Sequence, residues 1–298
     1  MKKGILYGIG AYVFWGFFPI YWKQLHNVPA IQLIGHRIIW SFLLLVVVLL
    51  FTKQWTEFRA AVNAKVLRIY TIAALLIGIN WLMYVWAVNH EFIVETSLGY
   101  FINPLFSVLM GVIIFKERLR PAQWIPVFLA ALGVAYLTFI YGRLPFIALT
   151  LAFSFGLYGL VKKLSPLGSL HGLTIETGIL FIPALGYIVF VQANNTAAFL
   201  HTGAVSDLLM IGAGLVTTIP LLMFASAARS IPLWVVGLLQ YIAPTLQFMI
   251  GVFIYKEAFN SHQLIGFGFV WTALIIFLVE NYFATRVYVE PIAEMGEG

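Results

Sequence analysis

Long apolar runs, separated by short polar connections, recur along the whole chain. A helix needs about 20 mostly apolar residues to cross a bilayer, and ten runs approach this length. They cover residues 4–22, 31–51, 69–88, 96–115, 122–140, 145–162, 172–191, 208–227, 235–255 and 263–283. The pattern therefore predicts an all-α integral membrane protein with ten transmembrane helices.

One helix ending occurs twice. Residues 102–117 read INPLFSVLMGVIIFKE and residues 242–257 read IAPTLQFMIGVFIYKE, so Pro104, Gly111 and Glu117 recur 140 residues later. The same shift aligns matching residues through nearly the whole chain. Each half holds five spans, an odd number, so the second half must enter the membrane in the opposite orientation. We predict two inverted five-helix repeats, residues 1–142 and 143–284, followed by a cytoplasmic C-terminal tail at residues 285–298. Such repeats commonly underlie alternating access; an old duplication with no role in transport is the alternative.

Composition narrows the class of protein. Only 9% of the residues are charged, 62% are hydrophobic and the mean hydropathy is +0.98, whereas soluble domains carry about 25% charged residues. The 17 Lys and Arg residues lie mostly on the side that holds both termini, which the positive-inside rule assigns to the cytoplasm. They form no domain-wide basic patch, so nucleic acid is not an expected partner. The chain has no cysteine, and we expect neither a metal nor a cofactor.

Polar and aromatic residues beside the repeated prolines are candidates for a substrate site. Proline inside a span frees a backbone carbonyl, and irregular backbone at this depth is tolerated only where protein or a cavity satisfies it. The third span adds an amide and aromatic rings on one helix face. We expect substrate contacts from Asn80, Trp81, Tyr84, Tyr100, Asn103, Tyr158, Gln240 and Tyr241. The alternatives are tolerated kinks with interhelical amide bonds, core packing, and interfacial aromatic belts.

Ionisable groups within spans are costly and therefore informative about function. His36, Arg37 and Glu176 break the apolar pattern, and the repeat superposes His36 on Glu176. We treat all three as candidates for coupling or gating. Glu176 is the candidate for a carboxylate that couples transport to protons. Arg37 shares the outer half of the membrane with Glu95, and we hypothesise an outer ionic latch between them that forms when the cavity faces inward. Snorkelling of Arg37 to the interface and an ordinary interfacial pair are the alternatives.

Several longer motifs carry a family resemblance. They are GHRIIWSFLL, GINWLMYVWAVN, ETSLGYFINPL, LAFSFGLYGLVKK, GLVTTIPLLMF and LQYIAPTLQFMIGV. Together they resemble RarD-type permeases of the drug/metabolite transporter superfamily, which have EamA-like repeats and a name tied to chloramphenicol sensitivity. The resemblance implies ten helices in two inverted halves, a central cavity lined mainly by the first four helices of each half, and a location in the bacterial inner membrane.

These observations favour a secondary transporter that moves a small organic solute, drug-like or amino-acid-like, by alternating access. An intramembrane enzyme is a poorer interpretation because the chain lacks cysteine, HExxH and GxSxG motifs. No Walker A motif is present, so direct use of ATP is not expected. A non-transporting membrane sensor is the third interpretation. Import and export both agree with the sequence, and small residues in the last span are compatible with contacts within or between protomers.

Overall fold

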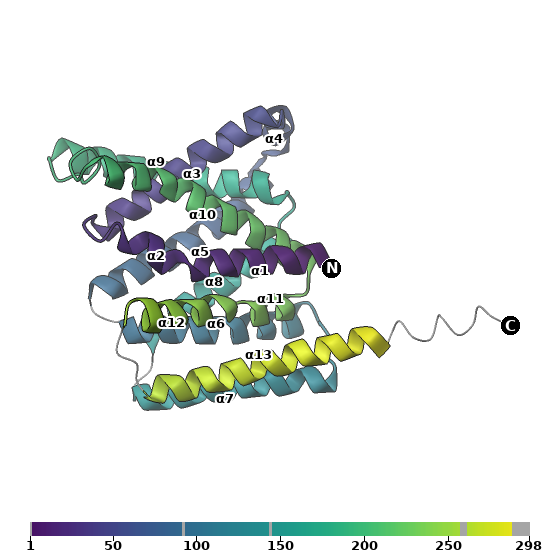
Figure 1. Cartoon of the computed structure of the whole chain (residues 1–298). Coiled ribbons are helices and arrows are strands. Elements are labelled where there is room, and N and C mark those ends of the chain that lie inside the picture. Colours follow the sequence, from purple (N-terminus) through teal and green to yellow (C-terminus); the bar gives the residue numbers. More distant parts are fainter. Residues whose placement is uncertain (1, 91–92, 143–144, 257–260, 288–298) are drawn as a thin grey trace.

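The computed structural model describes residues 2–90, 93–142, 145–256 and 261–287, and every regular element within these ranges is helical. Figure 1 shows the arrangement. The elements are α1 (Lys2–Gly16), α2 (Phe18–Lys23), α3 (Ala30–Phe51), α4 (Trp55–Ala61), α5 (Ala64–Asn89), α6 (Ile93–Ile114), a 3-10 turn η1 (Pro121–Gln123), α7 (Trp124–Tyr141), α8 (Phe146–Leu164), α9 (Ser169–Ala193), α10 (Ala204–Ser230), α11 (Leu233–Leu239), α12 (Ile242–Met249), a π-helix η2 (Ile250–Ile254) and α13 (Ser261–Val287).

Helix length and apolarity confirm the membrane class. Within the described ranges, eight helical segments are long and apolar enough to cross a bilayer, and Gly99–Ile114 and Leu264–Phe277 are shorter apolar helices. Each of the ten predicted runs therefore corresponds to an apolar helix. Large apolar side chains also face outward, among them Phe51, Phe139 and Ile182, at 85%, 83% and 76% exposure. Such a surface suits lipid rather than water.

Several local features differ from uniform spans. The first span breaks at Phe17, because Pro19 sits in the first turn of α2, where a missing N–H is tolerated. The short helix α4 was not among the predicted elements. The ninth span is divided into α11, α12 and η2, with Pro244 in the first turn of α12, whereas Pro104 lies inside continuous α6. The matching prolines thus occupy different local structures. The last helix, α13, continues to Val287, and residues 288–298 of the predicted tail lie outside the described residues.

The second helices of the two halves, α3 and α9, pack antiparallel. At the start of α3, Gln32 donates a hydrogen bond to the carbonyl of Thr196, just beyond the end of α9 (2.8 Å). Further along α3, the ring of Phe42 lies 4.9 Å from that of Phe181, in the middle of α9. The two helices therefore run in opposite directions.

The fourth and ninth spans also cross in opposite directions. The Tyr241 hydroxyl donates to the carbonyl of Phe101 near the start of α6 (3.2 Å). Near the end of α6, Gly111 lies beside the backbone nitrogen of Trp234 at the start of α11. The backbones of α6 and α11 approach each other most closely at Gly237, where an added Cβ would lie 2.6 Å from a backbone oxygen of α6. Glycine permits this close packing.

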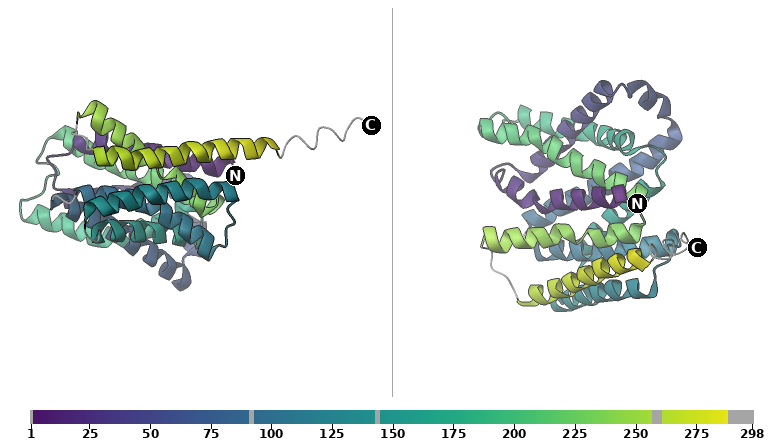
Figure 2. Two further views of the ribbon diagram at one scale, coloured as in Figure 1. Left: turned by 90° about the horizontal axis from the view of Figure 1, so that it is seen from below. Right: turned by 45° about the vertical axis from the view of Figure 1, so that its right-hand side comes forward.

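The fifth and tenth spans, α7 and α13, form a third antiparallel pair at the edge of the bundle (Figures 1 and 2). Gln123, just before α7, donates to Glu280 near the end of α13 (3.2 Å). Tyr136 near the end of α7 lies 2.7 Å from His262 at the start of α13. All three helix pairs join elements that occupy equivalent places in the two halves.

The repeated ending has the same backbone turn in both halves. Lys116 and Lys256 both adopt a left-handed conformation, with φ of 51° and 56°. In the first copy, the N–H of Glu117 bonds back to the carbonyl of Gly111 (3.1 Å), as in a helix C-cap. The Glu117 carboxylate lies where a Cβ on residue 111 would stand, so a larger residue there would displace it. Glu257 lies outside the described residues.

Candidate substrate cavity and closed face

A cavity of about 290 Å³ lies between helices of both halves. Its walls come from the first four spans of the first half and from α8, α10 and the α11–α12 segment of the second. Aromatic side chains dominate the lining: Tyr12, Trp15, Phe18, Trp22, Trp81, Tyr84, Tyr100 and Phe155. The polar lining groups are Arg37, Asn80, Asn103, Gln240 and Gln247. An apolar site with a few polar groups is the usual form of a small-molecule pocket.

Most residues predicted to contact substrate line this cavity. They are Asn80, Trp81, Tyr84, Tyr100, Asn103 and Gln240. Tyr158 and Tyr241 are fully buried and are not among the lining residues. Tyr158 donates a hydrogen bond to Glu176, and Tyr241 bonds to the α6 backbone. Their contact with substrate stays a prediction.

The three predicted amides differ in what they offer a ligand. Asn80 donates to the carbonyl of Leu151 (2.9 Å) and to Ser154 (3.0 Å), which fixes α5 against α8. Gln240 donates to Ser107 (2.9 Å). Asn103 is 9% exposed, and its Oδ1 has no hydrogen-bond partner among the described residues. The Oε1 of Gln240 also lacks a partner among the described residues. Both oxygens are buried, and a buried acceptor without a donor is costly, so a solute can bond to them only after the neighbouring side chains move.

Arg37 supplies the charge of the cavity. Its Nε donates to the hydroxyl of Thr217 (3.0 Å). Its guanidinium carbon lies 4.9 Å from the ring centroid of Trp22 and 4.7 Å from that of Trp81. Both indole rings thus hold the cation by cation–π contacts. The sequence indicated Arg37 as a gating group, and it gave no indication of Trp22, which resembles an ordinary interfacial aromatic.

The sequence also indicated His36 and Glu95 as coupling or gating residues. His36 is buried beside the ring of Phe199, at 4.9 Å between centroids, and its Nδ1 has no hydrogen-bond partner among the described residues. Glu95 belongs to α6, but its side chain is outside the described part of the chain. The Arg37–Glu95 latch therefore stays a prediction.

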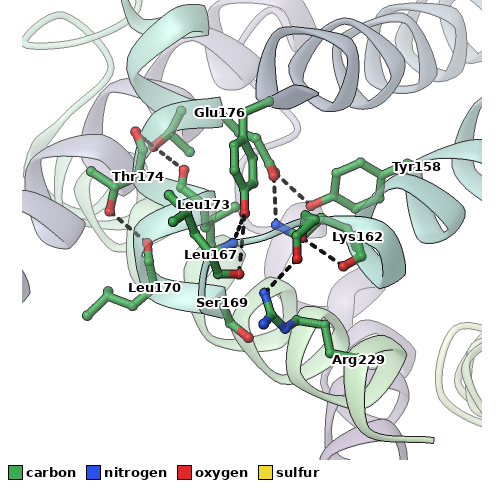
Figure 3. Close-up of polar contacts among 12 residues, drawn as sticks. Tyr158, Lys162, Leu167, Ser169, Leu170, Leu173, Thr174, Glu176 and Arg229 are labelled. Atoms are coloured by element: carbon green, nitrogen blue, oxygen red, sulfur yellow. Dashed lines mark hydrogen bonds and ion pairs between the residues drawn. The ribbon is translucent and has the colours of Figure 1, made fainter. Parts of the chain in front are cut away.

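Glu176 forms a buried ion pair away from the cavity. The Lys162 ammonium lies 2.6 Å from its Oε1, and both side chains are 1% exposed. The Tyr158 hydroxyl donates to Oε2 at 2.9 Å. Figure 3 shows both donors pointing at the carboxylate. Lys162 was not among the candidate residues chosen from the sequence. The structure places it in direct contact with Glu176.

A second ion pair joins three helices at the same end of the bundle. The Glu117 carboxylate accepts hydrogen bonds from Lys163 (3.0 Å), the N–H of Leu233 (3.0 Å) and the N–H of Trp234 (3.2 Å). Lys163 also donates to the carbonyl of Ile231 (2.9 Å). We call these Glu117, Lys163 and α11 contacts the Glu117 latch. The sequence repeat paired Lys163 and Glu117 with matching residues in the other half, but it did not reveal their contact.

The described residues contain no group of three His, Cys, Asp or Glu side chains that could hold a metal ion. A bundle of apolar helices surrounds a solute-sized cavity, and two ion pairs, one of them fully buried, join helices at one end of the bundle. This arrangement is typical of polytopic membrane transporters. Comparison with known proteins identifies the family within that class.

Residues 2–139 match the EamA-like transporter family. Over 93% of both chains, the sequence is 47% identical to "Uncharacterized transporter YojE" of Bacillus subtilis (strain 168). It is 45% identical to "Protein RarD" of Streptomyces exfoliatus, over 92% of this chain and 88% of that one. It is 39% identical to "Protein RarD" of Escherichia coli (strain K12), over 96% and 97%. The chain therefore belongs to the EamA-like transporter family, among the homologues of RarD, and this is a family of transporters rather than enzymes.

The fold also matches a solved structure. A crystal structure of a protein with 18% sequence identity superposes with a TM-score of 0.66, over 92% of this chain and 96% of that one. At this identity the likeness concerns the fold alone.

Proposed function

We propose that the protein is a secondary transporter that carries a small organic solute, drug-like or amino-acid-like, across the bacterial inner membrane by alternating access. The cavity carries this proposal: it is built from both halves, it has the size of a small solute, and the bundle is closed at one end by the Glu117 latch and the Lys162–Glu176 pair. A non-transporting sensor would also bind a ligand but would move none.

The inverted repeat is the basis of the mechanism. Equivalent helices related by an axis in the membrane plane must run antiparallel, and the three pairs α3/α9, α6/α11–α12 and α7/α13 do so. The left-handed turns at Lys116 and Lys256 recur at the same shift. These features support ten helices in two inverted five-helix repeats, residues 1–142 and 143–284. The family match over residues 2–139 agrees with the first repeat.

The positive-inside distribution sets the direction in which the cavity faces. With both termini in the cytoplasm, Trp22 at the end of α2 and Arg37 near the start of α3 lie in the outer half of the membrane. Lys162 and Lys163 at the end of α8 then lie near the cytoplasmic face, with Glu117. This conformation is therefore outward-facing.

The opposite state follows from exchanging the roles of the two halves. Phe18 and Gln247 line the outer cavity. Their counterparts at a shift of 140 residues are Tyr158 and Ser107, which are 0% and 4% exposed in the closed half. We infer that Tyr158 and Ser107 line the cavity when it faces the cytoplasm. Tyr158 would then contact substrate in that state, although it does not in this one.

Opening the closed half requires Lys162 to leave Glu176 or both to become solvated. A carboxylate exposed in this way can exchange a proton with the cytoplasm, so protons are the candidate coupling ion and Glu176 the candidate coupling group. The proposed Arg37–Glu95 latch would close the outer half when the cavity faces the cytoplasm.

Reconstitution tests this function. Purified protein in liposomes would be supplied with a panel of labelled amino acids, drugs and metabolites, with and without a proton gradient. We expect at least one solute to enter faster than into protein-free liposomes, and Trp81→Ala to slow its entry. Trp124→Ala is the matched control because Trp124 is 48% exposed on α7, away from the cavity lining. The proposal would be contradicted if no solute in the panel were taken up, or if Trp81→Ala left the uptake rate unchanged.

A further inference from the structure

We propose that the solute is a singly charged organic anion, in which a carboxylate on an aromatic or apolar body binds to Arg37. This inference rests on the proposed function and specifies the substrate class of the same cavity.

The first argument is charge balance. Among the described residues that line the cavity, Arg37 is the only formally charged one. A charged side chain at this depth is normally paired with an opposite charge or a backbone acceptor. Within the described part of the chain, Arg37 contacts a neutral hydroxyl and two indole rings, which stabilise the cation without neutralising it. A carboxylate would supply the missing negative charge.

The second argument is the geometry of the guanidinium group. It has five N–H donors in a planar fork that matches a carboxylate through two parallel hydrogen bonds. Thr217 uses the Nε donor, and the terminal nitrogens have no hydrogen-bond acceptor among the described residues. The Trp22 and Trp81 rings limit how the group can move. Arginine held in this way is suited to bidentate binding of an anion.

The third argument concerns the rest of the solute. The remaining walls are mostly apolar, with aromatic and aliphatic side chains, and the rings of Tyr84 and Tyr100 form an edge-to-face pair at 6.1 Å. One arginine matches one negative charge, whereas a phosphate monoester carries about −1.5 to −2. The site therefore fits a monocarboxylate with an apolar body better than a phosphate.

The test compares matched ligands that differ only in the charge of one end group. Calorimetric titration of the purified protein would use 3-phenylpropanoate, 3-phenylpropanamide and 3-phenylpropylamine. We expect the carboxylate to bind at least about tenfold more tightly than the amide, as one charge-assisted hydrogen-bonded pair provides, and the amine to bind most weakly. This comparison needs no variant, so it does not depend on the folding of a mutant.

Variants then assign the preference to Arg37. Arg37→Gln should remove the advantage of the carboxylate over the amide, and Arg37→Lys should keep part of it because lysine retains the charge without the fork. Arg68→Gln is the matched control, since Arg68 is exposed at the other end of α5 from Trp81. It should leave the order of the three ligands unchanged.

The outcomes separate this inference from the proposed function. Equal binding of acid and amide, tighter binding of the amine, no measurable binding of the acid, or an unchanged preference in Arg37→Gln would overturn the anion assignment. If neutral or cationic solutes were transported through the same cavity, the transport function would stand and the anion assignment would fall. If the anion bound through Arg37 but never crossed a liposome membrane, the anion site would stand and the transport function would fall.

Discussion

The Glu117 latch is the contact whose loss should most change which side of the cavity is open. It joins α6, α8 and α11 at the closed end, and its two side chains, Lys163 and Glu117, are 17% and 12% exposed. Glu117→Gln keeps the size of the side chain and one oxygen that can accept a backbone N–H. It removes the ion pair and weakens the remaining hydrogen bonds, while α6 and α11 stay packed through other residues.

The size of the effect follows from the number of donors. The carboxylate accepts three hydrogen bonds at 3.0, 3.0 and 3.2 Å. A hydrogen bond to a charged group contributes about 1.5–3 kcal/mol, and we assume that the Glu117→Gln protein loses the equivalent of one such bond. If the latch forms only when this end is closed, the inward-facing population should rise by about 10- to 150-fold.

Cysteine labelling measures this population directly, because the chain has no cysteine of its own. Ser107→Cys reports on the closed half and Gln247→Cys on the open cavity, and the repeat relates the two positions. In detergent, a maleimide reagent should label the Ser107→Cys protein about 10- to 150-fold faster when Glu117→Gln is added, for as long as the inward-facing state remains the minor one. Labelling of the Gln247→Cys protein should slow as the outward-facing state loses population.

Glu280→Gln is the matched control. Glu280 also forms an ion pair, in its case with Arg120 at 3.0 Å. This pair joins α13 to the segment just before α7, away from the cavity. This substitution should leave both labelling rates unchanged. If Glu117→Gln left the labelling rate at position 107 unchanged, or if Glu280→Gln raised that rate equally, the assignment of Glu117 as a latch would be refuted.

Three further predictions concern charged residues, and a fourth concerns the cavity wall. Lys162→Met should lower the free energy of unfolding by about 3–5 kcal/mol, because it leaves Glu176 buried without its cation, and adding Glu176→Gln should recover most of this loss in detergent unfolding. Glu176→Gln alone should leave solute binding measurable but abolish any dependence of uptake on the proton gradient; wild-type uptake that ignores the gradient would remove the coupling role. The charge swap Arg37→Glu with Glu95→Arg should restore transport lost in either single variant, and single variants with normal transport would end the outer-latch hypothesis. Trp81→Ala should weaken solute binding more than it lowers expression, whereas equal losses would indicate core packing.

The length of the apolar runs predicted the helices, because lipid allows no other way to satisfy the backbone of a single span. It did not predict the break at Phe17, where Pro19 is compatible with a helix start as well as with a kink. It also did not predict the division of the ninth span into α11, α12 and η2. The prediction of an inverted repeat rests on a helix ending that is encoded twice, and both copies have a left-handed lysine in the structure.

The candidate site was only partly predictable. Asn80 and Asn103 stand out because an amide in an apolar span needs a partner, and both line the cavity. Tyr158 and Tyr241 look equivalent to Tyr100 in sequence, yet helix rotation buries them elsewhere. Lys162 appeared to be a cation of a connecting loop, but its side chain is 1% exposed because it extends back to an acid on the next helix.

Solute counterflow tests the central claim, that one cavity is exposed alternately to the two faces of the membrane. Liposomes that contain the protein would be loaded with an unlabelled solute identified in the uptake panel and diluted into a trace of the same solute in labelled form. Alternating access predicts a transient accumulation of label above its equilibrium level, which depends on the internal solute and is diminished by Trp81→Ala. Label that only equilibrates, or that enters equally well into liposomes with the same protein but no internal solute, would contradict the account.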